Sequence, residues 1–225
     1  MRTRKREDTR ATLARRFVLA ERDVQVGDRS LTLILPHDVE ALLDEEAFAV
    51  DERLPYWADL WPSAIVLARV VAKETGDGCA LLELGCGLGL VSMAAQLAGY
   101  STLATDYYAD ALRFTTVNAR RNLGRAPAVR LVNWRVLPEN LGRFARVVAA
   151  DVLYERDYGQ LVARVLSRTL EPEGMATVAD PGRTAATAFV SHCEALGLSV
   201  HARRKIRFEE GSIRQMIQLY DVRRK

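Results

Sequence analysis

Hydrophobic positions follow two spacings that alternate along most of the chain. Compact apolar runs are typical of buried strands, whereas apolar positions that recur every three or four residues are typical of helices packed on one face. The runs predict strands at 79–84, 101–105, 128–132, 145–150 and 175–179. The second spacing predicts helices at 62–73, 88–98, 108–122, 157–170 and 184–195.

This alternation predicts the fold class. Strands separated by helices of this length pair in parallel, and helices cover both faces of the sheet. The C-terminal pattern differs, because only a short polar turn, and no helix, separates the segments 198–208 and 212–222. The sequence thus predicts an α/β fold: a Rossmann-like, doubly wound sheet of seven strands, mostly parallel, with an antiparallel C-terminal hairpin.

The N-terminal part is less regular. Residues 8–20 have a weak helical periodicity, residues 24–35 predict two short strands around a Gly-Asp turn, and residues 38–48 predict a short helix. We expect an N-terminal extension over residues 1–50 and one domain over residues 51–225. The extension is a candidate cover for a substrate, although no motif in it identifies a partner.

The composition of the 225-residue chain, with 49% hydrophobic and 27% charged residues, is that of one soluble globular domain. The net charge of +3 is mild, and the basic runs at the two ends favour solvated tails over contacts with an acidic partner. The three cysteines form no C-x-x-C pair, and His37, His192 and His201 have no ligand spacing. We therefore expect neither a disulfide framework nor a metal site.

Long apolar segments are missing from the sequence. The longest run, 64–68, is far shorter than a membrane span, and the N-terminus has no apolar signal core. The sequence predicts a cytoplasmic protein, in a reducing compartment, without a membrane partner.

A glycine-rich turn, "LLELGCGLGL" (81–90), follows the strand expected at 79–84. Glycines allow a tight turn and let a ligand approach the backbone N–H groups at the start of the next helix. A dinucleotide fingerprint, G-x-G-x-x-G, would need a glycine where Leu90 stands. Glu83, just before the turn, suits a ligand with an amino group and a sulfonium better than a pyrophosphate. Asp106 ends the next strand, where a ribose-binding carboxylate is expected.

These segments together resemble a known family. "ELGCGLG" (83–89) and "ATDYYADALRFTTVNARRN" (104–122) resemble the cofactor half of the seven-β-strand (class I) S-adenosylmethionine-dependent methyltransferases. "PYWADLWPSAIVLARVV" (55–71) and "ADVLYE" (150–155) narrow the resemblance to the protein lysine methyltransferase branch. That branch carries a Trp-Pro before its first core helix and a D-x-x-Y after its fourth strand.

The resemblance implies roles for individual residues. Glu83, Gly85 and Gly87 would surround the methionine part of S-adenosylmethionine, with Cys86 as a small residue of the same turn, and Asp106 would bind the ribose hydroxyls. The other implied cofactor contacts are Trp61 at the amino-acid end, Asn133 and Trp134 at the adenine, and Ala150 beneath the methionine part.

Three further positions have open interpretations. Asn133 stands where the branch often has an acid, so its bond to the adenine would lack charge assistance. Trp57 is expected to cover the sheet rather than to touch the cofactor. Asn118 and Asn122 lie four apart on one helix, and we expect a structural role, with bonds across that helix or to the adjoining loop.

Asp151 and Tyr154 follow the fourth expected strand, at the carboxyl edge where open α/β sheets bind ligands. The resemblance implies that both act on the target amine. Asp151 would favour the charged amine, so we expect it to orient an ammonium rather than to remove its proton. Tyr154 would hold the amine through its hydroxyl or its ring face. The alternative is structural, with Asp151 capping the helix near residue 157 and Tyr154 serving in packing.

The sequence therefore predicts an S-adenosylmethionine-dependent N-methyltransferase that modifies a lysine side chain of a protein and releases S-adenosylhomocysteine. A monomer is favoured. One alternative is methylation of a small-molecule or nucleic-acid amine. Val152 and Leu153 argue against a flipped base, because they replace the prolines of the N/D-P-P-Y motif. Another alternative is a non-catalytic module that binds S-adenosylmethionine.

Overall fold

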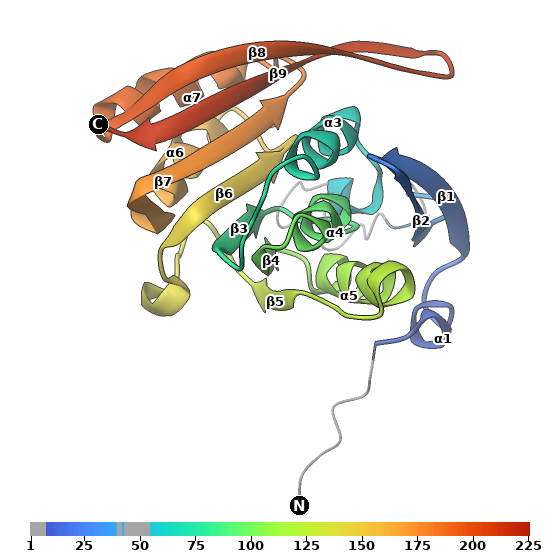
Figure 1. Cartoon of the computed structure of the whole chain (residues 1–225). Helices are drawn as coiled ribbons and strands as arrows, with labels where there is room; N and C mark the ends of the chain where they lie inside the picture. The colour runs from blue at the N-terminus through green and yellow to red at the C-terminus, as the bar shows by residue number, and fades with distance from the viewer. Residues whose placement is uncertain (1–7, 40–41, 43–54) are drawn as a thin grey trace, which may run out of the picture.

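The computed structural model describes residues 8–39, 42 and 55–225. A seven-stranded sheet with the order β5-β4-β3-β6-β7-β9-β8 forms its centre (Figure 1). The pairs from β5 to β7 are parallel, and β9 runs antiparallel to both β7 and β8, so the predicted fold class is confirmed. The strands are β3 (Ala80–Leu84), β4 (Ser101–Asp106), β5 (Ala128–Leu131), β6 (Phe144–Ala150), β7 (Leu170–Asp180), β8 (Leu198–Glu210) and β9 (Ile213–Arg224).

Helices cover both faces of this sheet (Figure 1). Successive side chains of a strand point to opposite faces, and β3 shows the consequence. Leu81 packs in the core beneath the first group of helices, whereas Leu82 and Leu84 pack in the core beneath the second. Glu83 therefore faces the same side as Leu81. The first group is α3 (Pro62–Val71), α4 (Leu90–Leu97) and α5 (Ala109–Leu123), and the second is α6 (Tyr158–Thr169) and α7 (Ala185–Ala195).

The N-terminal segment differs from the prediction. Of residues 8–20, only Arg10–Leu13 form a helix (α1), and β1 (Leu19–Val26) starts within the range expected to be a helix. Its pairing with β2 (Arg29–Pro36) buries Val24 and Val26, so strand pairing overrides the weak helical period. The two strands themselves are confirmed.

The helix expected at 38–48 and the domain boundary at residue 50 fall where the structure describes only residues 38, 39 and 42. The division into an extension and a domain therefore stays a prediction.

Two asparagines of α5 join the β1–β2 hairpin to the rest of the protein. The Asn118 amide accepts a hydrogen bond from Ile34 N (2.7 Å) and donates to Ile34 O and Leu88 O (both 3.0 Å). The Asn122 amide makes the same pair of bonds with Thr32 N and O (both 2.9 Å) and also donates to Asn118 O. The predicted structural role of both residues is confirmed, and their main partner is the edge of β2.

No helix in the described ranges has the length and apolar character needed to cross a membrane.

Candidate functional site

A large pocket opens where the order of the sheet reverses. β3 lies between β4 and β6, and the carboxyl ends of such neighbouring strands border the ligand crevice of open α/β sheets. The pocket there has a volume of about 980 Å³, part of it open to solvent. All the residues that the sequence singled out for the site line it: Trp61, Glu83, Gly85, Cys86, Gly87, Asp106, Asn133, Trp134, Ala150, Asp151 and Tyr154.

The glycine turn has left-handed backbone angles at each of its glycines, with φ of +70° at Gly85, +49° at Gly87 and +84° at Gly89. A Cβ atom on Gly87 would lie 3.0 Å from the carbonyl oxygen of Trp57. A Cβ on Gly89 would lie 2.9 Å from Cα of Thr115 in α5. Gly87 thus allows a close approach of the Trp57 backbone, and Gly89 allows close packing against α5.

Glu83 is a buried acid beneath the glycine turn. Its carboxylate accepts a hydrogen bond from Ser92 Oγ of α4, and its side chain is otherwise removed from water. Burial, opposed by the Ser92 bonds and reinforced by the negative charge of Asp106, raises the pKa of Glu83 to about 8. This acid lines the pocket and can bind a cation there when it loses its proton.

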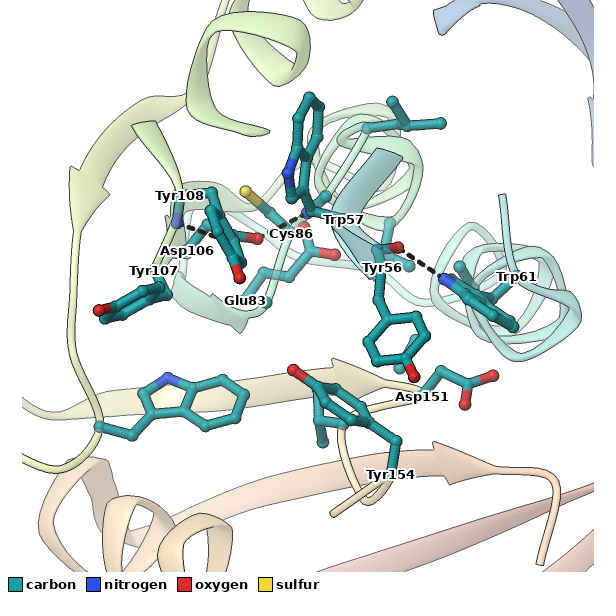
Figure 2. Close-up of a pocket in the computed structure, with 18 of the residues that line it drawn as sticks. Tyr56, Trp57, Trp61, Glu83, Cys86, Asp106, Tyr107, Tyr108, Asp151 and Tyr154 are labelled. Carbon is teal, nitrogen blue, oxygen red and sulfur yellow. Dashed lines mark hydrogen bonds between the residues drawn. The ribbon is translucent and has the colours of Figure 1, made fainter. Parts of the chain in front are cut away.

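Asp106, at the end of β4, holds the glycine turn in place. Its Oδ2 accepts from Gly87 N (3.0 Å) and its Oδ1 accepts from Tyr108 N (2.9 Å). Burial raises the pKa of Asp106 to about 6, against these backbone bonds. Figure 2 shows Glu83, Cys86 and Asp106 together on one side of the pocket.

Cys86 itself is buried, and its sulfur accepts a hydrogen bond from Thr115 Oγ1 (3.3 Å). Burial, strengthened by the nearby carboxyls, raises the pKa of its thiol well above the ordinary range. Cys86 is thus an inert packing group of the turn.

Asn133 and Trp134, which follow β5, also line the pocket. The Asn133 side chain accepts a hydrogen bond from Arg135 N (2.9 Å), which closes a tight turn after β5. Trp134 Nε1 is buried, and its N–H donates to no acceptor in the part of the chain that the structure describes. A buried N–H without a partner at a pocket wall marks a place where a ligand acceptor would fit.

The pocket walls also contain aromatic side chains that the sequence analysis did not single out. Tyr56 and Tyr154 are in ring contact, with centroids 4.9 Å apart, and the Trp61 indole donates to Tyr56 O (2.8 Å) (Figure 2). Trp57 lines the pocket in addition to covering the core, where it contacts Phe114. Two of the missed residues, Tyr107 and Tyr108, directly follow Asp106, so their position at a strand end was the available signal.

Asp151 has a partner that the sequence did not indicate. Arg183 donates from Nε (2.9 Å) and Nη2 (2.7 Å) to the same oxygen, Oδ1 of Asp151. The alternative that Asp151 caps a helix is wrong, because α6 begins at Tyr158 without a side-chain cap. Arg183 follows the carboxyl end of β7, so the same strand-end rule that selected Asp151 was the signal that could have found it.

Tyr154 lies between Tyr56 and Tyr158, whose ring centroids are 4.9 and 4.8 Å away. Burial, reinforced by Tyr158, raises the pKa of its phenol, so the hydroxyl stays protonated at neutral pH. Tyr154 therefore has both the packing role of the structural alternative and a place on the pocket wall.

The sheet order, the switch point and the glycine turn define the class I methyltransferase fold. The precorrin-6y C5,15-methyltransferase of Geobacter metallireducens GS-15 matches with a TM-score of 0.57 at 15% identity, over 72% of this chain and 87% of that chain. A likeness at this identity shows the fold alone.

The chain belongs to the lysine methyltransferase family, whose model matches residues 55–194. The electron transfer flavoprotein beta subunit lysine methyltransferase of Xenopus laevis is 29% identical over 133 residues, 57% of this chain and 53% of the relative. The protein N-lysine methyltransferase METTL21A of Danio rerio is 34% identical over 114 residues, 46% and 50% of the two chains. The chain spans about half the length of the curated relatives it matches.

The pocket fits S-adenosylmethionine in two respects. Glu83 supplies a buried acid for a ligand ammonium, and Trp134 has a buried N–H without a partner among the described residues. A metal ion has no comparable site: no group of three or more His, Cys, Asp or Glu residues in the described ranges could hold one. The three histidines are likewise absent from the residues that line this pocket.

Binding of the cofactor should release a proton from Glu83. In the free protein at pH 7 this carboxyl is mostly protonated, since its pKa is about 8, and a ligand ammonium would favour the charged form. Affinity for S-adenosylhomocysteine should therefore rise by up to about tenfold per pH unit between pH 6 and 8 and then level off. Asp106, with a pKa of about 6, would add to this trend only at its acidic end.

Isothermal titration calorimetry at pH 7 in two buffers of different ionisation enthalpy measures that proton. The Glu83→Gln variant should bind more weakly and lose this part of the pH dependence. Equal heats in both buffers for the unmodified protein would contradict the assignment.

Proposed function

We propose that the protein transfers a methyl group from S-adenosylmethionine to the side-chain nitrogen of a lysine in a protein substrate. The observation that carries this proposal is the position of Asp151 and Tyr154, which line the same pocket as Glu83 and Asp106. Membership of the lysine methyltransferase family supports the same substrate class. We assign Glu83 and the glycine turn to the methionine part, Asp106 to the ribose, and Asn133 and Trp134 to the adenine.

The chemistry sets a clear task for the protein. When bound, the cofactor supplies the methyl group from its sulfonium, and the electron pair of the broken S–C bond stays on sulfur. A lysine ammonium has no lone pair and must first lose a proton, which costs about 4 kcal/mol near pH 7.4. The residues of the pocket must therefore hold the amine without stabilising its charge too strongly, and the proton leaves to water.

Asp151 and Tyr154 divide this task in our proposal. Asp151 accepts a hydrogen bond from the incoming amine and orients it. The Tyr154 hydroxyl, kept protonated by burial, presents a neutral oxygen, and the rings of Tyr56 and Tyr154 shield the amine from water. No group that could act as a dedicated base is required.

The test is incorporation of radiolabel. Purified protein is mixed with methyl-labelled S-adenosylmethionine and a dialysed lysate of its own source, and labelled bands are hydrolysed to identify the modified amino acid. We expect methyl-lysine in at least one protein band. Label in small molecules or nucleic acid alone would favour the other amine substrates, and saturable cofactor binding without any labelled product would favour the non-catalytic module.

The wider setting of the protein is part of the same proposal. We infer a monomer that acts in the cytoplasm on a protein partner, rather than on nucleic acid or a membrane. Size-exclusion chromatography coupled to light scattering checks the oligomeric state, and fractionation of the source cells checks the compartment.

A further inference from the structure

Arg183 stands on a firmly held turn beside the pocket. Asp180, the last residue of β7, accepts hydrogen bonds from the backbone N–H groups of Gly182 and Arg183 (both 2.7 Å) through Oδ1. Gly182 has a φ of +93°, and a Cβ there would lie 2.6 Å from Nε2 of Gln218 in β9. The Asp180 bonds hold the turn after β7, from which the Arg183 side chain reaches Asp151.

The contact of Arg183 with Asp151 is one-sided. Both guanidinium bonds end on Oδ1, and no hydrogen bond reaches Oδ2 from the residues that the structure describes. The Asp151 side chain is only 3% exposed, whereas that of Arg183 is 34% exposed. The guanidinium also lies over the ring of Trp61, 5.7 Å from its centroid. One oxygen of a buried carboxylate is therefore tied down, and the other remains available to a ligand in the pocket.

We propose that Arg183 is a positioning residue for methyl transfer, which offsets the charge of Asp151 and leaves Oδ2 to accept a hydrogen bond from the target amine. This inference rests on the proposed function above. It resolves a conflict there, because a lone buried carboxylate would bind a lysine strongly as the ammonium and so oppose loss of the proton. A carboxylate already paired with a guanidinium offers the same acceptor geometry with less net negative charge.

Other titratable groups near the pair do not supply this effect. Asp180 accepts a hydrogen bond from the Arg183 backbone N–H, and burial raises the pKa of its carboxyl. Tyr56 and Tyr154 line the pocket with phenol groups, which carry no charge when protonated. Glu83 and Asp106 lie along the same pocket, under the cofactor in our assignment. Among these groups Arg183 is the cation that offsets Asp151.

A binding experiment tests the inference without knowledge of the substrate. n-Butylammonium chloride, which reproduces the end of a lysine side chain, is titrated at constant ionic strength into the complex with S-adenosylhomocysteine, and indole N–H resonances report its Kd. Arg183→Met keeps an apolar stem over Trp61 but removes the charge, so butylammonium should bind about tenfold more tightly. Arg183→Lys should stay close to the unmodified protein.

Arg203→Met is the matched control. Arg203 belongs to β8, and its guanidinium carbon also lies over an aromatic ring, 5.8 Å from the ring centroid of Tyr220. Its affinity for butylammonium should not change. Unchanged or weaker binding in Arg183→Met would overturn the proposal and leave Arg183 a support of the turn. A loss of affinity for S-adenosylhomocysteine alone would overturn it in favour of a cofactor contact.

Kinetics supply a second readout. With the protein identified from a labelled band as substrate, kcat is measured as a function of pH. The acidic limb of this profile should shift by about one unit to higher pH in Arg183→Met and should match the unmodified protein in Arg183→Lys. A profile that does not move contradicts the proposal. Should the unmodified protein label no band, the proposed function fails, whereas the butylammonium titration still decides the role of Arg183.

Discussion

Replacement of Asp151 by asparagine should lower kcat/KM for lysine methylation by about 10²- to 10³-fold. The change removes a charged acceptor from the target amine and leaves the partly exposed Arg183 guanidinium without its counter-charge. A hydrogen bond to a charged group contributes about 1.5–3 kcal/mol, and the uncompensated cation adds repulsion toward the ammonium, so a loss of about 3–4 kcal/mol is reasonable.

Asparagine is the right replacement because Asp151 has a left-handed backbone, with a φ of +55°. Asparagine tolerates this conformation, whereas alanine would add backbone strain. The rate of label transfer and the thermal unfolding midpoint are measured together. Asp157→Asn is the control, since Asp157 is exposed and makes no side-chain cap to α6. Full activity in Asp151→Asn, or an equal loss in the control, would refute the role assigned to Asp151.

Replacement of Asn118 by alanine should lower the free energy of unfolding by about 3–4 kcal/mol. The side chain is fully buried and makes three hydrogen bonds, to both backbone groups of Ile34 and to the carbonyl of Leu88. Without it, these backbone groups stay buried and unpaired, at a cost of about 1–3 kcal/mol each before the structure relaxes. Because Leu88 belongs to the glycine turn, the affinity for S-adenosylhomocysteine should fall as well.

Asn122→Ala is the matched comparison on the same helix. Asn122 makes the equivalent bonds to Thr32, but in a partly buried place where water can replace the amide. Its loss should cost only about 1 kcal/mol. Urea unfolding of both variants, followed by circular dichroism, measures the difference. Equal losses in the two variants would show that burial of the Asn118 bonds does not set the stability of the hairpin attachment.

Much of the fold could be predicted from the sequence because its signals are local. Apolar runs, helical periods and the glycine turn each lie within a short stretch, and the sheet strands appeared at the expected places. The carboxyl-edge rule then brought Glu83, Asp106 and Asp151 to one pocket, although they are far apart in the chain. The N-terminal prediction was wrong at residues 19–20, because pairing with β2 extends β1 back to Leu19, beyond the alternating pattern that predicted the hairpin.

Other features depend on contacts between distant segments. The third glycine looked like part of a ligand loop, yet Gly89 is required by the close approach of Thr115. Asn118 and Asn122 gave a helical spacing but no sign that they pair with the edge of β2. Arg183 stands near a strand end, but the sequence gives no sign that its partner is Asp151.

The sequence by itself determined the doubly wound sheet, the glycine turn and the acids at its carboxyl edge, because periodicity and glycine conformation act over a few residues. Only the tertiary structure decided which charge meets Asp151. Asp151 and Arg183 are 32 residues apart in the chain and meet because the carboxyl ends of β6 and β7 lie side by side, so their hydrogen bond depends on folded geometry that no local pattern records.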